Sequence, residues 1–312
     1  MHIRDIERRT ITMLTIAATL VTGCAADATS GGFVPEPGDE AVDPDDPPID
    51  PDPLDEDELV STSAPLCRDR ARRLSPGGLT FVIHISRNAD HAARAYRQLL
   101  EVRRLIRARD IFVIERQSPI ARDLGAAFPC NRFDYIAFPY ELPDAYDAVG
   151  FVDGVAVDWE RSLWSHGQSW TVAKLTDLAR AIRGRGAIPG VVPYWPSTFD
   201  DGHIVRASRM SYELAQIQDD CAHRGPDTFG DSARRLVRNF RRHDLSARDI
   251  GFEISLSSDP DADNHTGVER SARCTRNAYG KGARAIYLYG NGFPKLAPYF
   301  RRIAEMGLRS AR

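Results

Sequence analysis

Two carboxylates stand two residues apart in the segment 153–160, which reads DGVAVDWE. Successive side chains of a β-strand point to opposite faces, so Asp158 and Glu160 would share one face of a strand with Gly154 and Ala156. Neighbouring carboxylates push their pKa values apart, and the one that stays protonated can donate a proton. The spacing therefore favours general acid catalysis by one member of this pair.

The elements around this segment predict a barrel. Apolar runs expected to form strands lie at 79–86, 111–115, 133–138, 151–160, 188–195, 212–218, 250–256 and 285–289. Segments with helical spacing separate several of them, at 89–107, 171–183 and 232–242, and another follows the last strand. Eight strands alternating with helices predict an α/β fold, a (β/α)8 TIM barrel, with parallel strands. A doubly wound open sheet is the competing architecture, but no glycine-rich phosphate loop follows the first strand.

The segment 153–160 resembles the DGxDxDxE signature of glycoside hydrolase family 18, the chitinases and related N-acetylglucosaminidases, at seven of its eight positions. This resemblance implies that Glu160 protonates the glycosidic oxygen and that Asp158 orients the acetamido group of the substrate. Ala156 departs from the family, which has another Asp there. Gln218 stands where the family has a supporting Tyr, and Tyr289 where it has the aromatic floor of a sugar site.

Glu253 offers a second carboxylate arrangement. It alternates with apolar residues in 250–256 and can therefore face the barrel interior. Glu160 with Glu253 resembles the acid/base and nucleophile layout of the large clan of retaining (β/α)8 glycosidases. A separation of about 5–5.5 Å between the carboxyl groups would make Glu253 a covalent nucleophile. The alternative is an inward Glu neutralised by an arginine such as Arg116.

Aromatic side chains follow the ends of several expected strands. Flat rings cover the apolar faces of pyranoses, so these residues suit a carbohydrate cleft, although each is also a common core residue. The candidates for substrate binding are Tyr140, Trp164, Trp170, Tyr194, Trp195 and Tyr289, together with Gln218.

Metal, cofactor and nucleic-acid chemistry have little support. The eight histidines form no HxH or HExxH spacing, and the acidic loop 259–264 lacks the glycine that an EF-hand needs. Residues 65–312 hold 38 basic and 29 acidic side chains, but the arginines are spread over helices without a reader motif. We therefore expect no metal, no cofactor and no nucleic-acid partner.

The N-terminus predicts export and lipid attachment. Three arginines precede the apolar run 10–23, which is shorter than the roughly 20 residues of a spanning helix. The run ends in a sequence that resembles the bacterial lipoprotein box, which implies that 1–23 is a signal peptide and that Cys24 carries a diacylglycerol. Ala25 then favours the outer membrane or cell surface as the location within the cell envelope.

Residues 24–64 predict a disordered tether. They contain seven prolines and 13 carboxylates but no basic side chain, and few of them suit a core. The globular domain is then 65–312.

The four cysteines beyond Cys24 are an even number in an oxidising compartment and predict two disulfides. Three pairings are conceivable. Only Cys67 with Cys130 and Cys221 with Cys274 keeps each bridge local in the expected barrel.

The sequence thus predicts a lipid-anchored, exported, monomeric glycoside hydrolase. Its expected substrate is a polysaccharide, including those that contain N-acetylglucosamine, and retaining acid catalysis by Glu160 is the expected mechanism. A catalytically weak glycan-binding lipoprotein on the same barrel is the alternative, which Ala156 and Gln218 both favour. A structural envelope protein without a sugar ligand would instead bury its aromatic residues away from the strand-four carboxylates.

Overall fold

The computed structural model describes residues 78–138, 152–159, 172–193, 201–256, 266–290 and 295–309. The predicted signal peptide, the predicted tether, Cys24 and Cys67 lie outside these residues. Among the described residues, none of the helices is long and apolar enough to cross a membrane.

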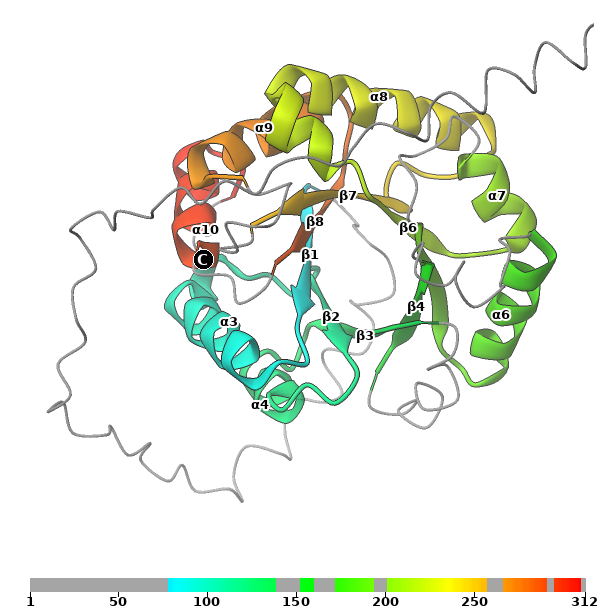
Figure 1. Ribbon diagram of the computed structural model, residues 1–312, viewed down its shortest axis with the longest axis horizontal. Helices are drawn as coiled ribbons and strands as arrows, with labels where there is room; N and C mark the ends of the chain where they lie inside the picture. The colour runs from blue at the N-terminus through cyan, green and yellow to red at the C-terminus, as the bar shows by residue number, and fades with distance from the viewer. Residues whose placement is uncertain are drawn as a thin grey trace, which may run out of the picture. The chain divides into compact units, whose positions relative to one another are not determined.

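Eight parallel strands close into a barrel in chain order, with β1 beside β8 (Figure 1). The predicted (β/α)8 fold is therefore confirmed. The strands are β1 (Thr80–Ile85), β2 (Ile111–Glu115), β3 (Arg132–Ala137), β4 (Gly154–Trp159), β5 (Ile188–Pro193), β6 (Tyr212–Ala215), β7 (Ile250–Ser255) and β8 (Ala285–Tyr289).

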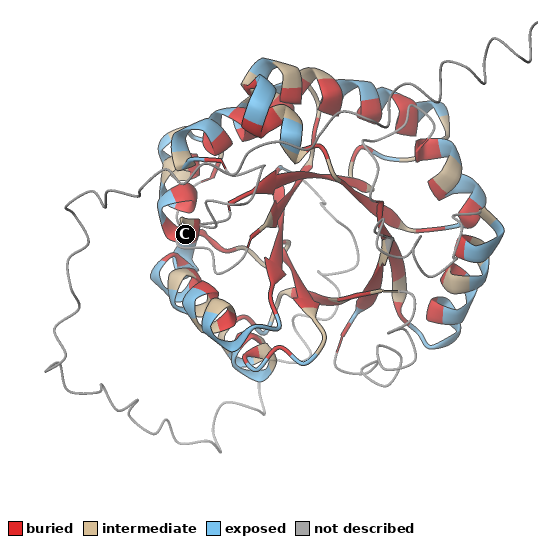
Figure 2. Ribbon diagram, viewed as in Figure 1, coloured by how far each residue is buried: buried red, intermediate tan, exposed pale blue. Residues whose placement is uncertain are grey.

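Helices surround the barrel and turn their buried faces toward it (Figure 2). They are α3 (Ala89–Glu101), η1 (Arg103–Leu105), α4 (Ala121–Ala127), α6 (Val172–Gly184), α7 (Asp201–Ser208), η4 (Asp220–Arg224), α8 (Pro226–Arg242), α9 (Val268–Gly280) and α10 (Leu296–Glu305).

Helix α8 shows why these segments form an outer layer. Its buried apolar residues recur with helical spacing at Ala233, Leu236, Val237 and Phe240, while the arginines between them are exposed. Burying this stripe against the outer barrel face removes apolar surface from water, and the arginines keep the opposite face solvated. The predicted helix 232–242 covers the C-terminal part of α8, which begins six residues earlier, at Pro226.

Some predicted boundaries were wrong. Strand β6 ends at Ala215, three residues before Gln218, because the backbone N–H of Ile217 bonds to the carbonyl of Ala215 in a local turn. Similarly, β4 begins at Gly154 rather than at residue 151. At the end of β6, a local turn thus uses a backbone N–H that a continued strand would have used.

Side chains inside the barrel form a separate apolar cluster. It contains Val82, Ile111, Val113, Ile136, Ala156, Val192, Tyr212, Leu214 and Tyr287. The alternate residues of the same strands point outward and join the larger core beneath the helices. Period-2 alternation therefore separates an interior layer from an exterior layer, as the barrel prediction requires.

A buried polar triad fills the N-terminal end of the barrel. Arg132 donates two hydrogen bonds to Asp134, at 2.7 and 2.5 Å, and the Tyr212 hydroxyl donates a third at 2.5 Å. Burial and the neighbouring Asp134 charge raise the pKa of Tyr212, so its hydroxyl remains a donor. Gly190 leaves room for the Tyr212 ring, because a Cβ at position 190 would collide with that ring. We call these three residues the floor triad.

A second buried ion pair joins the C-terminal segment to the start of the barrel. Arg309 donates to both carboxylate oxygens of Asp110 at 2.7 Å and lies over the Phe81 ring, 4.6 Å from its centroid. The backbone N–H groups of Phe81 and Arg107 also donate to Asp110. The pair is therefore bidentate, and backbone donors support its carboxylate.

The predicted disulfide between Cys221 and Cys274 is present, with a Cα–Cα distance of 6.0 Å, and it connects η4 to α9. Cys130 also forms a disulfide, whose other half lies outside the described residues.

Candidate active site

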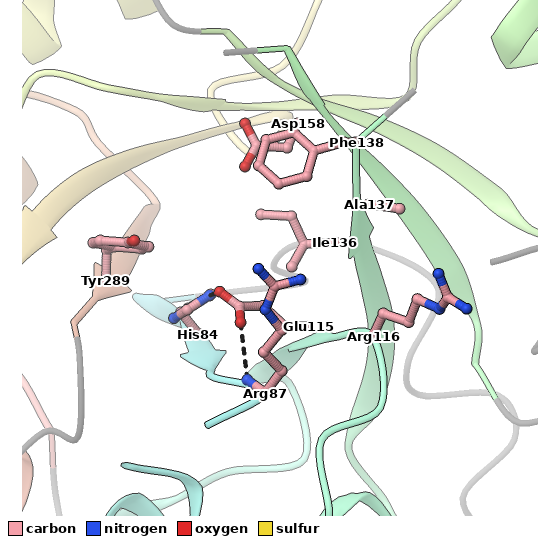
Figure 3. Close-up of a pocket in the computed structure, with 9 residues that line it drawn as sticks. All are labelled: His84, Arg87, Glu115, Arg116, Ile136, Ala137, Phe138, Asp158 and Tyr289. Carbon is pink, nitrogen blue, oxygen red and sulfur yellow. Dashed lines mark hydrogen bonds and ion pairs between the residues drawn. The ribbon is translucent and has the colours of Figure 1, made fainter. Parts of the chain in front are cut away.

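A pocket of about 170 Å³ opens at the C-terminal ends of the strands (Figure 3). Residues at or near the last positions of β1, β2, β3, β4 and β8 contribute to its lining. This is the end at which barrel enzymes carry their active sites. The lining residues are His84, Arg87, Glu115, Arg116, Ile136, Ala137, Phe138, Asp158 and Tyr289.

The best-defined polar group in this pocket is the pair of His84 and Glu115. The imidazole Nε2 lies 2.9 Å from Glu115 Oε1, and the backbone N–H of Arg87 donates to Glu115 Oε2 at 2.8 Å. His84 is buried, with 1% of its side chain exposed, whereas 28% of the Glu115 side chain is exposed. The buried His84 imidazole therefore holds the Glu115 carboxylate, which is partly accessible to solvent.

The environment of Glu115 keeps its carboxylate ionised. Burial acts to raise the pKa of Glu115, but the hydrogen bond and charge of His84, with the backbone and charge of Arg87, outweigh burial and lower this pKa to about 2. At neutral pH, Glu115 therefore accepts hydrogen bonds and donates none. It does not have the protonated form that a general acid needs.

Tyr289 lies next to this pair. Its ring centroid is 4.7 Å from that of His84, with an angle of 39° between the ring planes. Figure 3 shows the Tyr289 side chain at one side of the pocket and Asp158 and Phe138 at another. The predicted sugar-stacking residue Tyr289 therefore lines the same pocket as the strand-four carboxylate Asp158.

Asp158 lies where strand alternation predicted it. It pairs in register with Val192 on β5 and contributes to the pocket from β4. Ala156, two residues earlier on the same face, is fully buried in the interior apolar cluster. The described part of β4 therefore brings one carboxylate to the pocket, and Ala156 supplies only a methyl group beneath it.

Glu253 also faces the interior, as predicted, but lies deeper. It pairs in register with Tyr287, and 3% of it is exposed. Burial raises the pKa of Tyr287, and the charges of Glu253, Tyr289, Asp158 and Glu115 raise it further. The Tyr287 hydroxyl therefore stays neutral, and the nearby carboxylates add to this effect through their negative charges. Glu253 is not among the described residues that line the pocket.

The other predicted site residues are not brought to this pocket by the described structure. Glu160, Tyr140, Tyr194 and Trp195 lie outside the described residues, as do Trp164 and Trp170. Gln218 is half-buried beyond the end of β6 and does not contribute to the pocket lining.

The site predicted from the sequence did not include His84, Arg87 or Glu115. A usable signal existed, because His84 and Glu115 each continue the inward-facing alternation of an apolar strand at its C-terminal end. Their contact depends on the β1–β2 register, which pairs His84 with Val113 and so leaves Glu115 beyond it. No local pattern specifies that register.

Within the described residues, no group of three or more His, Cys, Asp or Glu side chains is arranged to hold a metal ion.

Comparison with known proteins identifies the fold. No protein-family profile and no curated protein matches the chain. Among solved structures, it is similar to a GH18 chitinase from Pseudoalteromonas aurantia, with 11% identity, a TM-score of 0.52 and coverage of 72% of this chain and 98% of that one. This chain shares the TIM-barrel fold.

Two further solved structures match with lower TM-scores. The HMG-CoA lyase from Brucella melitensis has 12% identity and a TM-score of 0.46, and the match covers 74% of this chain and 92% of that one. The YdjI aldolase from Escherichia coli K12 has 8% identity and a TM-score of 0.45, and the match covers 75% of this chain and 92% of that one. Because barrels host many unrelated reactions, this fold alone does not assign a reaction to the chain.

Proposed function

We propose that this protein is a glycoside hydrolase whose active site is the pocket at the C-terminal mouth of the barrel. The observation that carries the proposal is the joint presence of Asp158 and Tyr289 in one pocket, because the first is the strand-four carboxylate and the second a flat ring that suits a pyranose face. The GH18 chitinase with the same fold is consistent with this assignment.

In the proposed mechanism, Glu160 is the general acid that protonates the glycosidic oxygen. It follows Asp158 by two residues, and strand alternation supports a shared face for the two side chains. The Asp158 charge disfavours ionisation of a neighbouring carboxyl group, which favours the protonated form that the acid requires. Glu115, whose pKa is lowered to about 2, is assigned no proton transfer.

Two retaining schemes differ in the nucleophile. In a substrate-assisted scheme, an N-acetyl carbonyl of the sugar attacks the anomeric carbon while Asp158 orients the acetamido group. In a two-glutamate scheme, Glu253 forms a covalent glycosyl-enzyme intermediate that water then hydrolyses. The depth of Glu253 below the pocket lining favours the first scheme.

A catalytically weak glycan-binding protein is the second candidate. The observation that favours it is Ala156, whose methyl group sits in the apolar interior beneath Asp158. Asp158 then has no carboxyl partner at position 156 with which to exchange a proton. Binding alone needs only the aromatic face and fixed polar groups of the pocket.

The test is hydrolysis of chitohexaose and cellohexaose by the full chain and by its Glu160→Gln variant. We expect turnover to fall by roughly 10²–10⁴-fold in Glu160→Gln with little change in KM, since the amide keeps the shape but has no transferable proton. Glu101→Gln on the outer surface is the matched control and should leave turnover unchanged.

Two further variants separate the schemes. Asp158→Asn should be damaging only if the substrate participates, whereas Glu253→Gln should be damaging only if Glu253 is the nucleophile. Binding of either sugar without hydrolysis, unaffected by Glu160→Gln, would favour the glycan-binding protein. Wild-type turnover in the Glu160→Gln variant would remove the proposed acid.

A further inference from the structure

The carboxylate of Glu115 is built as a fixed acceptor. His84 Nε2 and the Arg87 backbone N–H each contact one of its two oxygens. An ionised carboxylate offers about four lone-pair positions, so these two contacts leave acceptor capacity on both oxygens. Because Glu115 lines the pocket with 28% of its side chain exposed, the remaining capacity is accessible from the pocket.

The residue that supports this acceptor is buried and contacts two neighbouring strands. His84 is buried on β1, contacts Glu115 of β2 on one side and stacks at a tilt on Tyr289 of β8 on the other. These three strands are neighbours in the barrel. The buried His84 imidazole therefore contacts both the Glu115 carboxylate and the Tyr289 ring. Strand pairing sets the relative positions of the three residues.

This combination matches the chemistry of a sugar ring. A pyranose has an apolar C–H face and hydroxyl groups around its edge, and specific pockets combine aromatic surface with a few placed polar groups. Hydrogen bonds to an ionised acceptor are shorter and about twice as strong as those between neutral groups. Figure 3 also shows the Arg87 guanidinium reaching into the pocket beside Glu115, where it adds a donor group.

We propose that Glu115, held by His84 and the Arg87 backbone, accepts hydrogen bonds from neighbouring hydroxyl groups of a sugar ring that lies against Tyr289. The proposal rests on the proposed function for the class of ligand. It adds a binding position on the β8–β1–β2 side of the pocket and assigns to Glu115 the role of holding the sugar rather than transferring a proton.

The experiment measures binding rather than turnover. Isothermal titration of the full chain carrying Glu160→Gln with chitohexaose and cellohexaose gives the reference Kd for whichever probe binds. Adding Glu115→Gln should weaken that Kd by at least about tenfold, the effect of losing roughly 1.4 kcal/mol, because the amide nitrogen cannot accept a hydroxyl donor. Glu115→Asp keeps the charge but withdraws the carboxylate, and should weaken binding less than Glu115→Gln.

Controls separate this role from a structural one. Glu101→Gln in the same background should leave Kd unchanged, since Glu101 forms an exposed ion pair with Arg301 on the helical layer. In the Glu160→Gln chain, addition of the bound probe should shift the NMR resonances of the His84 imidazole.

The possible outcomes distinguish this proposal from the proposed function. Absence of hydrolysis, with binding that Glu115→Gln weakens, would contradict the hydrolase and leave the acceptor role standing. Unchanged affinity in folded Glu115→Gln and Glu115→Asp, or no binding of either probe by the reference protein, would overturn the acceptor role. A lowered melting temperature of Glu115→Gln with unchanged Kd would also overturn it, because that result describes a purely structural ion pair.

Discussion

The Arg309–Asp110 pair allows a sharp stability prediction. Asp110 is fully buried and Arg309 is 3% exposed, and the pair is bidentate. Arg309→Met keeps much of the side-chain volume over Phe81 and removes the charge, so Asp110 is left as a buried carboxylate with backbone donors alone. Removing one partner of a buried ion pair typically costs about 3–5 kcal/mol. For a domain of this size, this corresponds to a fall in Tm of roughly 6–20 °C.

The assay is urea and thermal unfolding of the full chain with its disulfides intact, followed by circular dichroism. Arg302→Met on α10 is the matched control, because Arg302 forms exposed ion pairs with Glu269 and Glu305, and its loss should lower stability far less than the loss of Arg309. The double variant Asp110→Asn with Arg309→Met should be less destabilised than the sum of the single variants. A loss in Arg309→Met no larger than in Arg302→Met would refute the reasoning.

Two other predictions concern pH and the disulfide. Because the pKa of Glu115 is lowered to about 2, its ionised form stabilises the fold above the ordinary carboxyl pKa, and this contribution is lost as pH falls toward 2. Thermal unfolding at each pH should show the advantage of wild type over Glu115→Gln shrinking between about pH 5 and pH 2, and parallel pH profiles would contradict this. The Cys221–Cys274 bridge closes a sequence separation of 53 residues. Cys221→Ser with Cys274→Ser should lower stability by up to about 4 kcal/mol in the chain-entropy model, measured by urea unfolding, and an unchanged midpoint would count against it.

Local patterns were sufficient to predict much of the barrel. The strand 285–289 was predicted with the bounds that β8 has, because an apolar run between turn signals depends little on its partners. The inward position of Asp158 also followed from alternation along β4 alone. By contrast, the end of β6 depends on where a turn captures the Ile217 N–H, a competition between local and cross-strand hydrogen bonds.

The candidate site was harder to predict because it is assembled across strands. Glu115 and His84 are 31 residues apart, and their contact follows from the stagger between β1 and β2. The shift in the pKa of Glu115 follows from the same contact and cannot be assigned to either residue alone. The family resemblance lies on β4, whereas the best-defined polar contacts of the described pocket join β1 and β2.

The floor triad has a consequence for how this protein tolerates substitutions. Arg132, Asp134 and Tyr212 seal the barrel at the end opposite the pocket, and Gly190 makes room for the Tyr212 ring. None of the three residues of the floor triad lines the pocket. Substitutions at the mouth leave the contacts of this triad in place, whereas a side chain at position 190 would disturb them. The residues that pack the floor of the barrel and the residues that line its mouth are therefore separate sets, so a change in one set leaves the contacts of the other in place.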